Sequence, residues 1–262
     1  MNPTANSPWP AGQRCAVSLT YDDAVPVHYQ HVAPLLSAKG LTGTFNLTGQ
    51  ASVTEAIEQW RHVAEAGHEL GNHTLFHPCR RDPPERYGWL EPHYDLCAYT
   101  MQRLADELRV ANALLRLIDR RTRRTFAHPC GHATVGPAGR EISIDDLVLR
   151  LFVAGRGSST GRLVDPACPN YASLGCVGGD GKTFDSLRES VEQAVECGAW
   201  LIFIFHGVGK GTHGGYVETE AHDALVDYLA ANADRCWGAS MVEVALHLQA
   251  QAPAKRPDGP AT

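Results

Sequence analysis

Residues 16–24 read Ala-Val-Ser-Leu-Thr-Tyr-Asp-Asp-Ala, and this stretch decides the fold expected for the chain. An apolar run over 16–20 has the composition of a buried strand, and two carboxylates follow it closely. In α/β barrels the active site is assembled where strands run into loops. Adjacent aspartates at a strand end are more often turn or capping residues, so the rest of the sequence has to support a catalytic interpretation.

Short β-rich runs alternate with amphipathic stretches on both sides of this segment, which predicts parallel strands joined by helices. The expected strands are 16–20, 43–47, 68–71, 124–129, 147–154, 200–205 and one beginning at residue 237. The expected helices are 26–39, 54–66, 96–117, 184–196, 217–232 and one before residue 248, with Thr54 as a cap and Gly40 and Gly67 as stops. The 262 residues fit one α/β barrel or one large domain.

The predicted domain spans residues 14–248, after an amino-terminal lead at 1–13 and before a tail at 249–262 that is predicted to be disordered. Residues 78–95 are rich in proline, arginine and aromatics and are predicted to be an inserted loop. The glycine-rich stretch 155–181 is predicted to be a long connection. Residues 179–183 are predicted to turn into a helix rather than to form a phosphate-binding loop.

Composition narrows the possible partners. The formal charge of -6 disfavours nucleic acid, and no apolar run is long enough to span a membrane. The amino terminus has no signal-peptide pattern, which predicts a cytoplasmic protein, or a secreted one if a leader has been removed. The eight cysteines form no CxxC pair and are predicted to be buried free thiols, with a Cys168–Cys176 disulfide as the rival interpretation.

Two further motifs lie where expected strands end. His73 and His77 are four residues apart and can face one metal ion, although two polar loop histidines would give the same pattern. His206 ends the apolar run 200–205, where a hydrogen-bonded histidine at the edge of the core is the alternative. Two histidines and a carboxylate make a zinc ligand set with an open water position.

These three motifs, together with residues 126–131, resemble those of the polysaccharide deacetylases, the NodB-homology family or carbohydrate esterase family 4. The resemblance rests on Thr20 to Ala24, on the His-Thr-x-x-His motif at 73–77, on residues 126–131 and on residues 204–206. These motifs occur in the family's order, and the resemblance spans residue 18 to about residue 248, nearly the whole chain. The resemblance implies a single domain of the α/β class, a distorted (β/α) barrel of the NodB type, with residues 14–248 as the catalytic domain.

The resemblance also implies a metal centre. Asp23, His73 and His77 would hold a divalent ion, Zn²⁺ or another such as Co²⁺, Ni²⁺ or Mn²⁺. The substrate would be an acetylated oligo- or polysaccharide, whose acetyl groups are attached to the sugar through nitrogen (N-acetyl) or oxygen (O-acetyl). The sequence does not separate these linkages, because both need the same chemistry.

Three positions would complete the chemistry that the resemblance implies. Asp22 would be the general base that takes a proton from the attacking water. His206 would be the general acid that protonates the leaving amine or alcohol. The backbone amide of Cys130 would help to stabilise the oxyanion, since Cys130 occupies the place of an aromatic residue in the usual third motif.

The sequence departs from the family pattern in several places. Ala127 stands where the third motif carries an arginine that tunes the catalytic aspartate, and Arg124 lies nearby but is expected to point elsewhere. Ala24 replaces the usual glycine after the two aspartates, and an Asp-Trp fourth motif is not recognisable in 155–181. The resemblance is therefore to an atypical member.

Candidate substrate-binding residues lie in the inserted loop and near the third motif. Tyr87, Trp89, His93 and Tyr94 could stack on sugar rings or could only anchor the loop, and Trp89 is the best candidate. His128 and His132 are predicted to line the pocket; a second metal site is the weaker interpretation, because Pro129 and Gly131 prevent a helix from presenting them together.

The sequence predicts a metal-dependent carbohydrate deacetylase. The alternatives are a cyclic imide or ureide amidohydrolase resembling allantoinase, and a non-catalytic metal- or carbohydrate-binding protein. The absence of a leader favours the small-molecule amidohydrolase, whereas Asp22 and His206 argue against a pure binding protein, which would need neither a base nor an acid.

Overall fold

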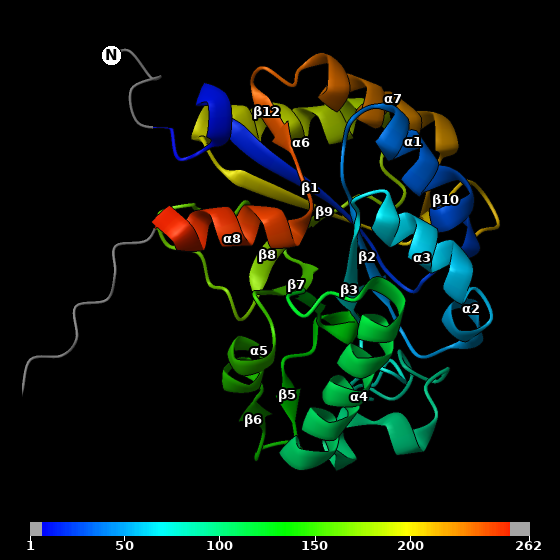
Figure 1. Ribbon diagram of the computed structural model, residues 1–262. Helices are drawn as coiled ribbons and strands as arrows, with labels where there is room; N and C mark the ends of the chain where they lie inside the picture. The colour runs from blue at the N-terminus through cyan, green and yellow to red at the C-terminus, as the bar shows by residue number, and fades with distance from the viewer. Residues whose placement is uncertain (1–6, 252–262) are drawn as a thin grey trace, which may run out of the picture.

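A computed structural model describes residues 7–251, and Figure 1 shows helices arranged around a central group of strands. Seven parallel strands close into a barrel because the last of them, β9, pairs with β1 from Ala16↔Trp200 to Tyr21↔Phe205. In order around the barrel the strands are β1 (Cys15–Tyr21), β2 (Thr44–Leu47), β3 (Glu69–Asn72), β4 (Phe126–Ala127), β7 (Gly155–Ser159), β8 (Leu174–Gly178) and β9 (Trp200–Phe205). The prediction of a distorted (β/α) barrel in a single domain is confirmed.

The barrel is irregular beside β1. An eighth strand, β12 (Cys236–Gly238), pairs with the first half of β1 through Cys15↔Cys236, whereas β2 pairs with its second half through Thr20↔Thr44. β4 has only two residues, and the register shifts between β7 and β8. Two small pairs, β5 (Thr134–Val135) with β6 (Ile142–Ser143) and β10 (Gly207–Val208) with β11 (Tyr216–Val217), lie outside the barrel sheet.

Helices connect the barrel strands, and all of them except α2 and α5 lie in stretches predicted to be helical. They are α1 (Ala33–Ala38), α2 (Ala51–Thr54), α3 (Ile57–Glu65), α4 (Met101–Asp119), α5 (Asp145–Leu151), α6 (Phe184–Cys197), α7 (Thr219–Ala231) and α8 (Met241–Gln251). A π-helical turn, η2 (His28–Val32), precedes α1, and short 3-10 turns are η1 (Pro10–Gly12), η3 (Pro92–Tyr94), η4 (Leu96–Ala98) and η5 (Pro129–Gly131). Thr100 and Thr183 cap α4 and α6 through their side chains, and burial of each helix's apolar face supplies most of its stability.

The prediction of a strand at 147–154 is wrong. These residues belong mainly to the helix α5, which has two aspartates in its first turn. Carboxylates at a helix amino terminus interact favourably with the helix dipole. The apolar run was too short for periodicity to separate a buried helix from a strand.

The prediction of a long connection over 155–181 is also wrong, because it contains the barrel strands β7 and β8. Glycines hide these strands in the sequence, since they are usually depleted in strand interiors. A Cβ atom on Gly155 would come within 2.5 Å of the Ala172 carbonyl oxygen. The backbone just before β8 therefore passes so close to residue 155 that only glycine fits there. The predicted turn into a helix at 179–183 is confirmed, since α6 begins at Phe184.

The structure also bears on the predictions for Thr54, for the cysteines and for the tail. Thr54 ends α2 instead of capping the next helix, whose N-cap is Ala56. All eight cysteines lie in the described part of the chain and are free, so the Cys168–Cys176 disulfide is absent. Half of them are not buried, contrary to the predicted burial; these are Cys97, Cys130, Cys168 and Cys197. The predicted disordered tail lies largely outside the described residues, which end at 251.

The strands supply the core. Every residue of β1 is buried, and its apolar side chains pack with those of β9 and of the surrounding helices. Between residues 7 and 251, the structure holds no helix that is both long and apolar enough to cross a membrane.

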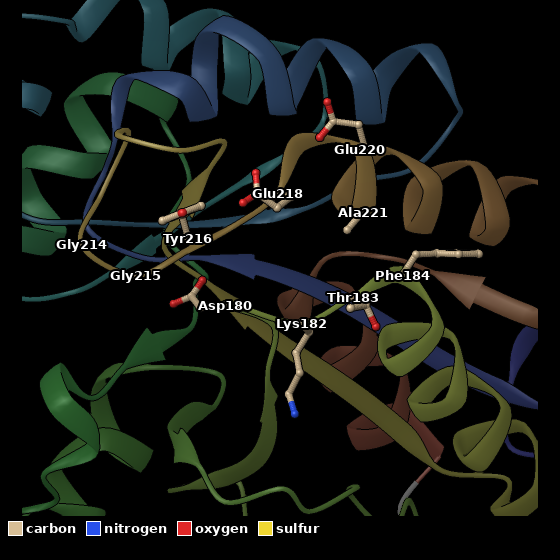
Figure 2. Close-up of a pocket in the computed structure, with 11 residues that line it drawn as sticks. Asp180, Lys182, Thr183, Phe184, Gly214, Gly215, Tyr216, Glu218, Glu220 and Ala221 are labelled. Atoms are coloured by element: carbon tan, nitrogen blue, oxygen red, sulfur yellow. The ribbon is translucent and has the colours of Figure 1, made fainter.

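Two hollows open near the carboxyl end of β9. The larger has a volume of about 960 Å³ and is lined by Asp22, Asp23, His73 and His206 together with aromatic residues of the inserted loop. The smaller, of about 680 Å³, lies beside Asp180 and the start of α6, and Tyr216 and Glu218 also line it (Figure 2). Gly214 lines both hollows, which places them side by side.

Candidate active site

The predicted catalytic residues come together at the carboxyl ends of the barrel strands. Asp22 and Asp23 follow β1, His73 follows β3, and His206 follows β9. The Asp22 N–H donates to the Phe205 carbonyl oxygen at 2.9 Å, so the first and last motifs are tied by the strand pairing that closes the barrel. The topology, rather than closeness in the sequence, assembles the site.

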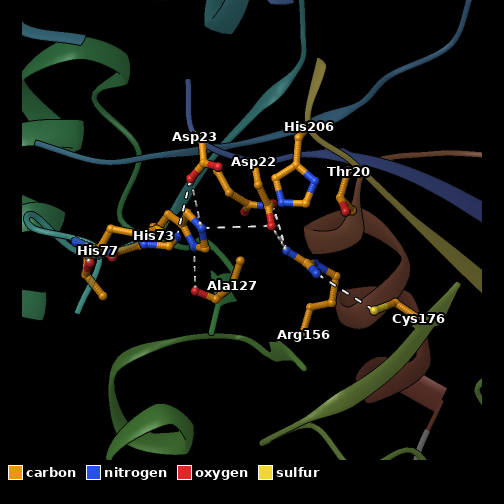
Figure 3. Close-up of polar contacts among 12 residues, drawn as sticks. Thr20, Asp22, Asp23, His73, His77, Ala127, Arg156, Cys176 and His206 are labelled. Carbon is orange, nitrogen blue, oxygen red and sulfur yellow. Dashed lines mark hydrogen bonds and ion pairs between the residues drawn. The ribbon is translucent and has the colours of Figure 1, made fainter. Parts of the chain in front are cut away.

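The three predicted metal ligands face one another (Figure 3). Oδ1 of Asp23 lies 3.5 Å from Nε2 of His73 and 3.4 Å from Nε2 of His77. Donor atoms about 2.0–2.1 Å from a tetrahedral zinc ion are roughly 3.3 Å apart, so the observed separations fit such an ion. The donor set of two imidazoles and one carboxylate leaves a fourth position open.

The orientation of His73 is also suited to a ligand. Its Nδ1 lies 2.8 Å from the Ala127 carbonyl oxygen, to which an Nδ1–H donates. That hydrogen bond leaves Nε2 directed at Asp23 (Figure 3). A ligating histidine usually donates its other ring N–H to such an acceptor, which fixes its tautomer.

Charges around the three ligands shift their pKa values in the absence of an ion. Burial alone would raise the pKa of Asp23, but the hydrogen bond and charge of His73 lower it well below the ordinary value. Burial alone would lower the pKa of His73, but the neighbouring carboxylates raise it, whereas burial lowers the pKa of His77 to about 4. His77 is therefore neutral at pH 7, which is the form in which histidine binds a metal ion.

Left-handed backbone surrounds the candidate metal site. Five non-glycine residues here have positive φ angles: Asp23 (69°), Ala24 (52°), Thr74 (68°), His77 (51°) and Cys130 (52°). Thr74 is β-branched, a type for which this conformation is especially unusual. Hydrogen bonds hold it: the Thr74 N–H donates to Asn72 Oδ1 at 2.8 Å, and Thr74 Oγ1 accepts from the His77 N–H at 2.9 Å.

Asp22 has a different environment from Asp23. It is buried and forms an ion pair with Arg156 of β7, whose guanidinium approaches both carboxylate oxygens at 2.7 and 2.5 Å (Figure 3). Asn46 of β2 donates to Asp22 Oδ1 at 2.8 Å. Burial alone would raise the pKa of Asp22, but Arg156 and His73 outweigh it and keep the pKa below the ordinary value.

Arg156 supplies the positive charge that is missing at Ala127, and no sequence motif marks it. Arg124 points elsewhere, as expected: it pairs with Asp119 at 3.0 Å. Arg156 lies in the strand β7, within the stretch interpreted as a connection. Arg156 is buried and flanked by two glycines. This pattern indicates a site residue only when the stretch is already recognised as a barrel strand.

His206 forms a pair with a second residue that the sequence analysis missed. Its Nδ1 lies 2.5 Å from Asp180 Oδ2, and its backbone N–H donates to Asp180 Oδ1 at 3.0 Å. Burial alone would lower the pKa of His206, but Asp180 and Asp22 raise it to about 9. His206 is therefore protonated at neutral pH. Asp180 also lines the smaller hollow (Figure 2). Because His206 lines the larger one, the Asp180–His206 pair lies between the two hollows.

A further histidine, His213, lies over the site. Its ring is parallel to that of His206, with centroids 5.1 Å apart, and its Nε2 is 3.5 Å from Asp23 Oδ2. His213 lies between β10 and β11 in a glycine-rich loop, where no sequence motif marks it. His213 thus places a third imidazole nitrogen next to Asp23, beside Oδ2, whereas His73 and His77 face Oδ1.

Cys130 lines the larger hollow in the short turn after β4. Its thiol is exposed and comes within 4.8 Å of the donor atoms of His77 and Cys79. The turn places residue 130 beside the candidate metal site, as its predicted backbone role requires.

Aromatic side chains form one wall of the larger hollow. Trp89, 60% exposed, lies 5.9 Å from the His77 ring, and Phe76 stacks on Tyr94 at 5.1 Å. The predicted inserted loop therefore reaches the site. Tyr87 belongs to a small buried cluster that anchors the loop instead.

The two histidines near the third motif differ in position. His128 lines the larger hollow, and its Nε2 lies 2.9 Å from the Ala172 carbonyl oxygen. His132 accepts the Arg80 N–H at 3.0 Å and touches Tyr87, so it contacts the inserted loop. The two rings have separate partners.

The amino-terminal half of the chain carries a family signature. Residues 11–137 match the family model for polysaccharide deacetylase. The resemblance to the polysaccharide deacetylases is confirmed. No curated protein sequence matches the chain.

Solved structures show the same fold. A Mycobacterium smegmatis protein assigned to the polysaccharide deacetylases shares 15% identity, covers 97% of this chain and 96% of its own, and has a TM-score of 0.66. The peptidoglycan deacetylase PdaC of Bacillus subtilis shares 14% identity over 90% of this chain and 92% of its own, with a TM-score of 0.55. These low identities relate the folds alone.

The same architecture also occurs in an inactive protein. A family 4 carbohydrate esterase pseudoenzyme of Bacillus anthracis shares 17% identity, covers 88% of this chain and 65% of its own, and has a TM-score of 0.52. The fold therefore does not establish catalysis by itself, because activity depends on the side chains of the site.

Proposed function

We propose that this chain is a metal-dependent hydrolase that removes N- or O-acetyl groups from an acetylated carbohydrate. The observation that carries the proposal is the placement of two differently tuned aspartates beside one histidine pair: Asp23 faces His73 and His77, whereas Asp22 faces Arg156. A pure binding site would need the first arrangement only. The match of the amino-terminal half to the polysaccharide deacetylase family supports the choice of substrate class.

Asp23, His73 and His77 would hold the metal ion, and Zn²⁺ is the ion that suits this donor set. When bound, such an ion supplies Lewis-acid chemistry at the acetyl carbonyl and lowers the pKa of water. Asp22 accepts the proton of the attacking water, because Arg156 and Asn46 hold its carboxylate ionised and oriented.

The other residues act on the far side of the reacting carbon. His206 donates a proton to the leaving amine or alcohol, and Asp180 keeps it charged and oriented for that step. The Cys130 backbone amide stabilises the oxyanion. Each proton transfer by a positioned side chain contributes about two to four orders of magnitude to the rate.

Acetate release tests the proposal directly. Zn²⁺-loaded protein is incubated with acetylated xylan and with N-acetylglucosamine oligomers, and acetate is measured over time with Asp22→Asn as the inactive control. Acetate from one substrate and none from the control would establish deacetylation and its linkage. Failure on every acetylated sugar, together with hydrolysis of a cyclic imide, would assign the amidohydrolase alternative instead.

The pH dependence should follow His206. Because the general acid must be protonated, kcat/KM should stay level through neutral pH and fall about tenfold per unit above pH 9, where His206 loses its proton. In Asp180→Asn the charge that raises the pKa is gone, so the alkaline limb should move down by about one to two pH units. A limb that stays in place would exclude His206 as the titrating acid.

Trp89 is proposed to stack on a sugar ring at the entrance. Trp89→Ala should raise KM for an oligosaccharide about fivefold with little change in kcat, because about 1 kcal/mol of apolar contact is lost. Leu117→Ala, at another exposed apolar residue on α4, is the matched control. An unchanged KM would leave Trp89 only a loop residue.

A further inference from the structure

Three donor side chains meet where η2 and α7 pack together, apart from the residues that line the larger hollow. His31 comes from the π-helical turn, and His222 and Asp223 come from the amino-terminal part of α7. His31 Nε2 lies 3.0 Å from Asp223 Oδ1, and His222 Nδ1 also lies 3.0 Å from that oxygen. All three donor atoms lie within 4.8 Å of one another.

The geometry is close to that of a bound zinc ion. Nitrogen and oxygen ligands at 2.0–2.2 Å from a tetrahedral ion are roughly 3.3 Å apart, so the observed 3.0 Å separations need to open by only a few tenths of an ångström. His31 and Asp223 have side chains 37% and 32% exposed, whereas that of His222 is fully buried. An ion could therefore enter from solvent and keep water as a fourth ligand.

A residue behind the cluster orients the buried ligand. His222 Nε2 lies 2.8 Å from the hydroxyl of Tyr21, which is itself buried among aromatic rings. Such a partner on the second nitrogen is typical of metal-bound histidines, since it fixes the ring while the first nitrogen faces the ion.

We propose that His31, His222 and Asp223 form a second divalent-metal site of the zinc type, separate from the one at Asp23. It would join η2 to α7, and through Tyr21 it would support the end of β1, directly before Asp22. The turn η2 follows the two aspartates in the chain, so an ion at this place would hold the segment that leaves the active site. The role is structural, and it does not depend on the proposed deacetylation.

Zinc stoichiometry separates the two sites. We expect His31→Ala, at a partly exposed ligand, to bind one equivalent fewer than wild type in equilibrium dialysis against buffered Zn²⁺. His62→Ala, at an exposed histidine of α3, is the matched control and should bind as wild type does. Asp23→Ala should also lose one equivalent, and the double variant His31→Ala/Asp23→Ala should lose two.

Thermal unfolding gives a second readout. In the Asp23→Ala background, zinc at about a hundredfold over its Kd should raise Tm by about 5 °C or more, and His31→Ala should abolish that rise. If His31→Ala binds as much zinc as wild type and keeps the rise, the cluster is only hydrogen-bonded and the proposal is overturned. If the wild-type protein releases no acetate but His31→Ala still binds one zinc fewer than wild type, the result would support this site and refute the proposed function.

Discussion

Asp22→Asn is expected to lower kcat for acetate release by about two to four orders of magnitude, because it removes the general base. The amide oxygen can still accept hydrogen bonds from Arg156 and Asn46, so the local structure has a substitute for the lost carboxylate. The ligands Asp23, His73 and His77 are untouched, and zinc content measured by dialysis should match wild type.

The measurement is single-substrate kinetics on zinc-loaded protein, with circular dichroism to confirm that the variant is folded at the assay temperature. A variant that keeps more than about a tenth of wild-type turnover would exclude Asp22 as the base. A variant that is inactive and has also lost its zinc would show that Asp22 acts on the metal instead.

Arg156→Met is expected to destabilise the barrel by about 3–5 kcal/mol, because it leaves the buried Asp22 carboxylate without its partner. Urea denaturation would measure the free energy of unfolding. Arg188→Met removes the exposed pair with Asp185 on α6 and should cost only about 0–1 kcal/mol, which makes it the matched control.

The double variant Asp22→Asn/Arg156→Met tests the cause. Because it removes both buried charges, it should recover much of the stability lost in Arg156→Met alone. In Arg156→Met alone, Asp22 keeps its carboxylate but loses the positive charge that opposes the effect of burial. The pKa of Asp22 should therefore rise, and the acid limb of kcat/KM should move to higher pH. A single variant as stable as wild type would contradict a buried ion pair.

The strands that frame the motifs could be predicted from the sequence, whereas two others could not. β1 and β9 are apolar runs that end in Asp22-Asp23 and His206, so composition and chemistry point to the same residues. β7 and β8 are rich in glycine. At Gly155, for example, the backbone at Ala172 passes too close to leave room for a side chain. Local composition alone predicts a loop at such a strand, and only the assembled barrel shows that it is a strand.

The same difference explains which site residues were predicted. The metal ligands belong to motifs whose spacing is visible in the chain, and the structure brings Asp23, His73 and His77 together. Arg156 acts on Asp22 across the barrel, and Asp180 acts on His206 from the end of the neighbouring strand β8; both lie in the stretch predicted to be a connection. A partner supplied by a distant strand leaves no spacing to detect, even though it decides the pKa of the residue it touches.

The left-handed backbone around the candidate metal site has a consequence for selection on heat resistance. A non-glycine residue in that conformation costs roughly 1–2 kcal/mol, which the rest of the barrel has to offset. At Ala24 a glycine would relieve the cost without removing a ligand. At Asp23 and His77 the same exchange would discard a metal ligand, so thermostable descendants selected for activity should change Ala24 and retain the strained pair.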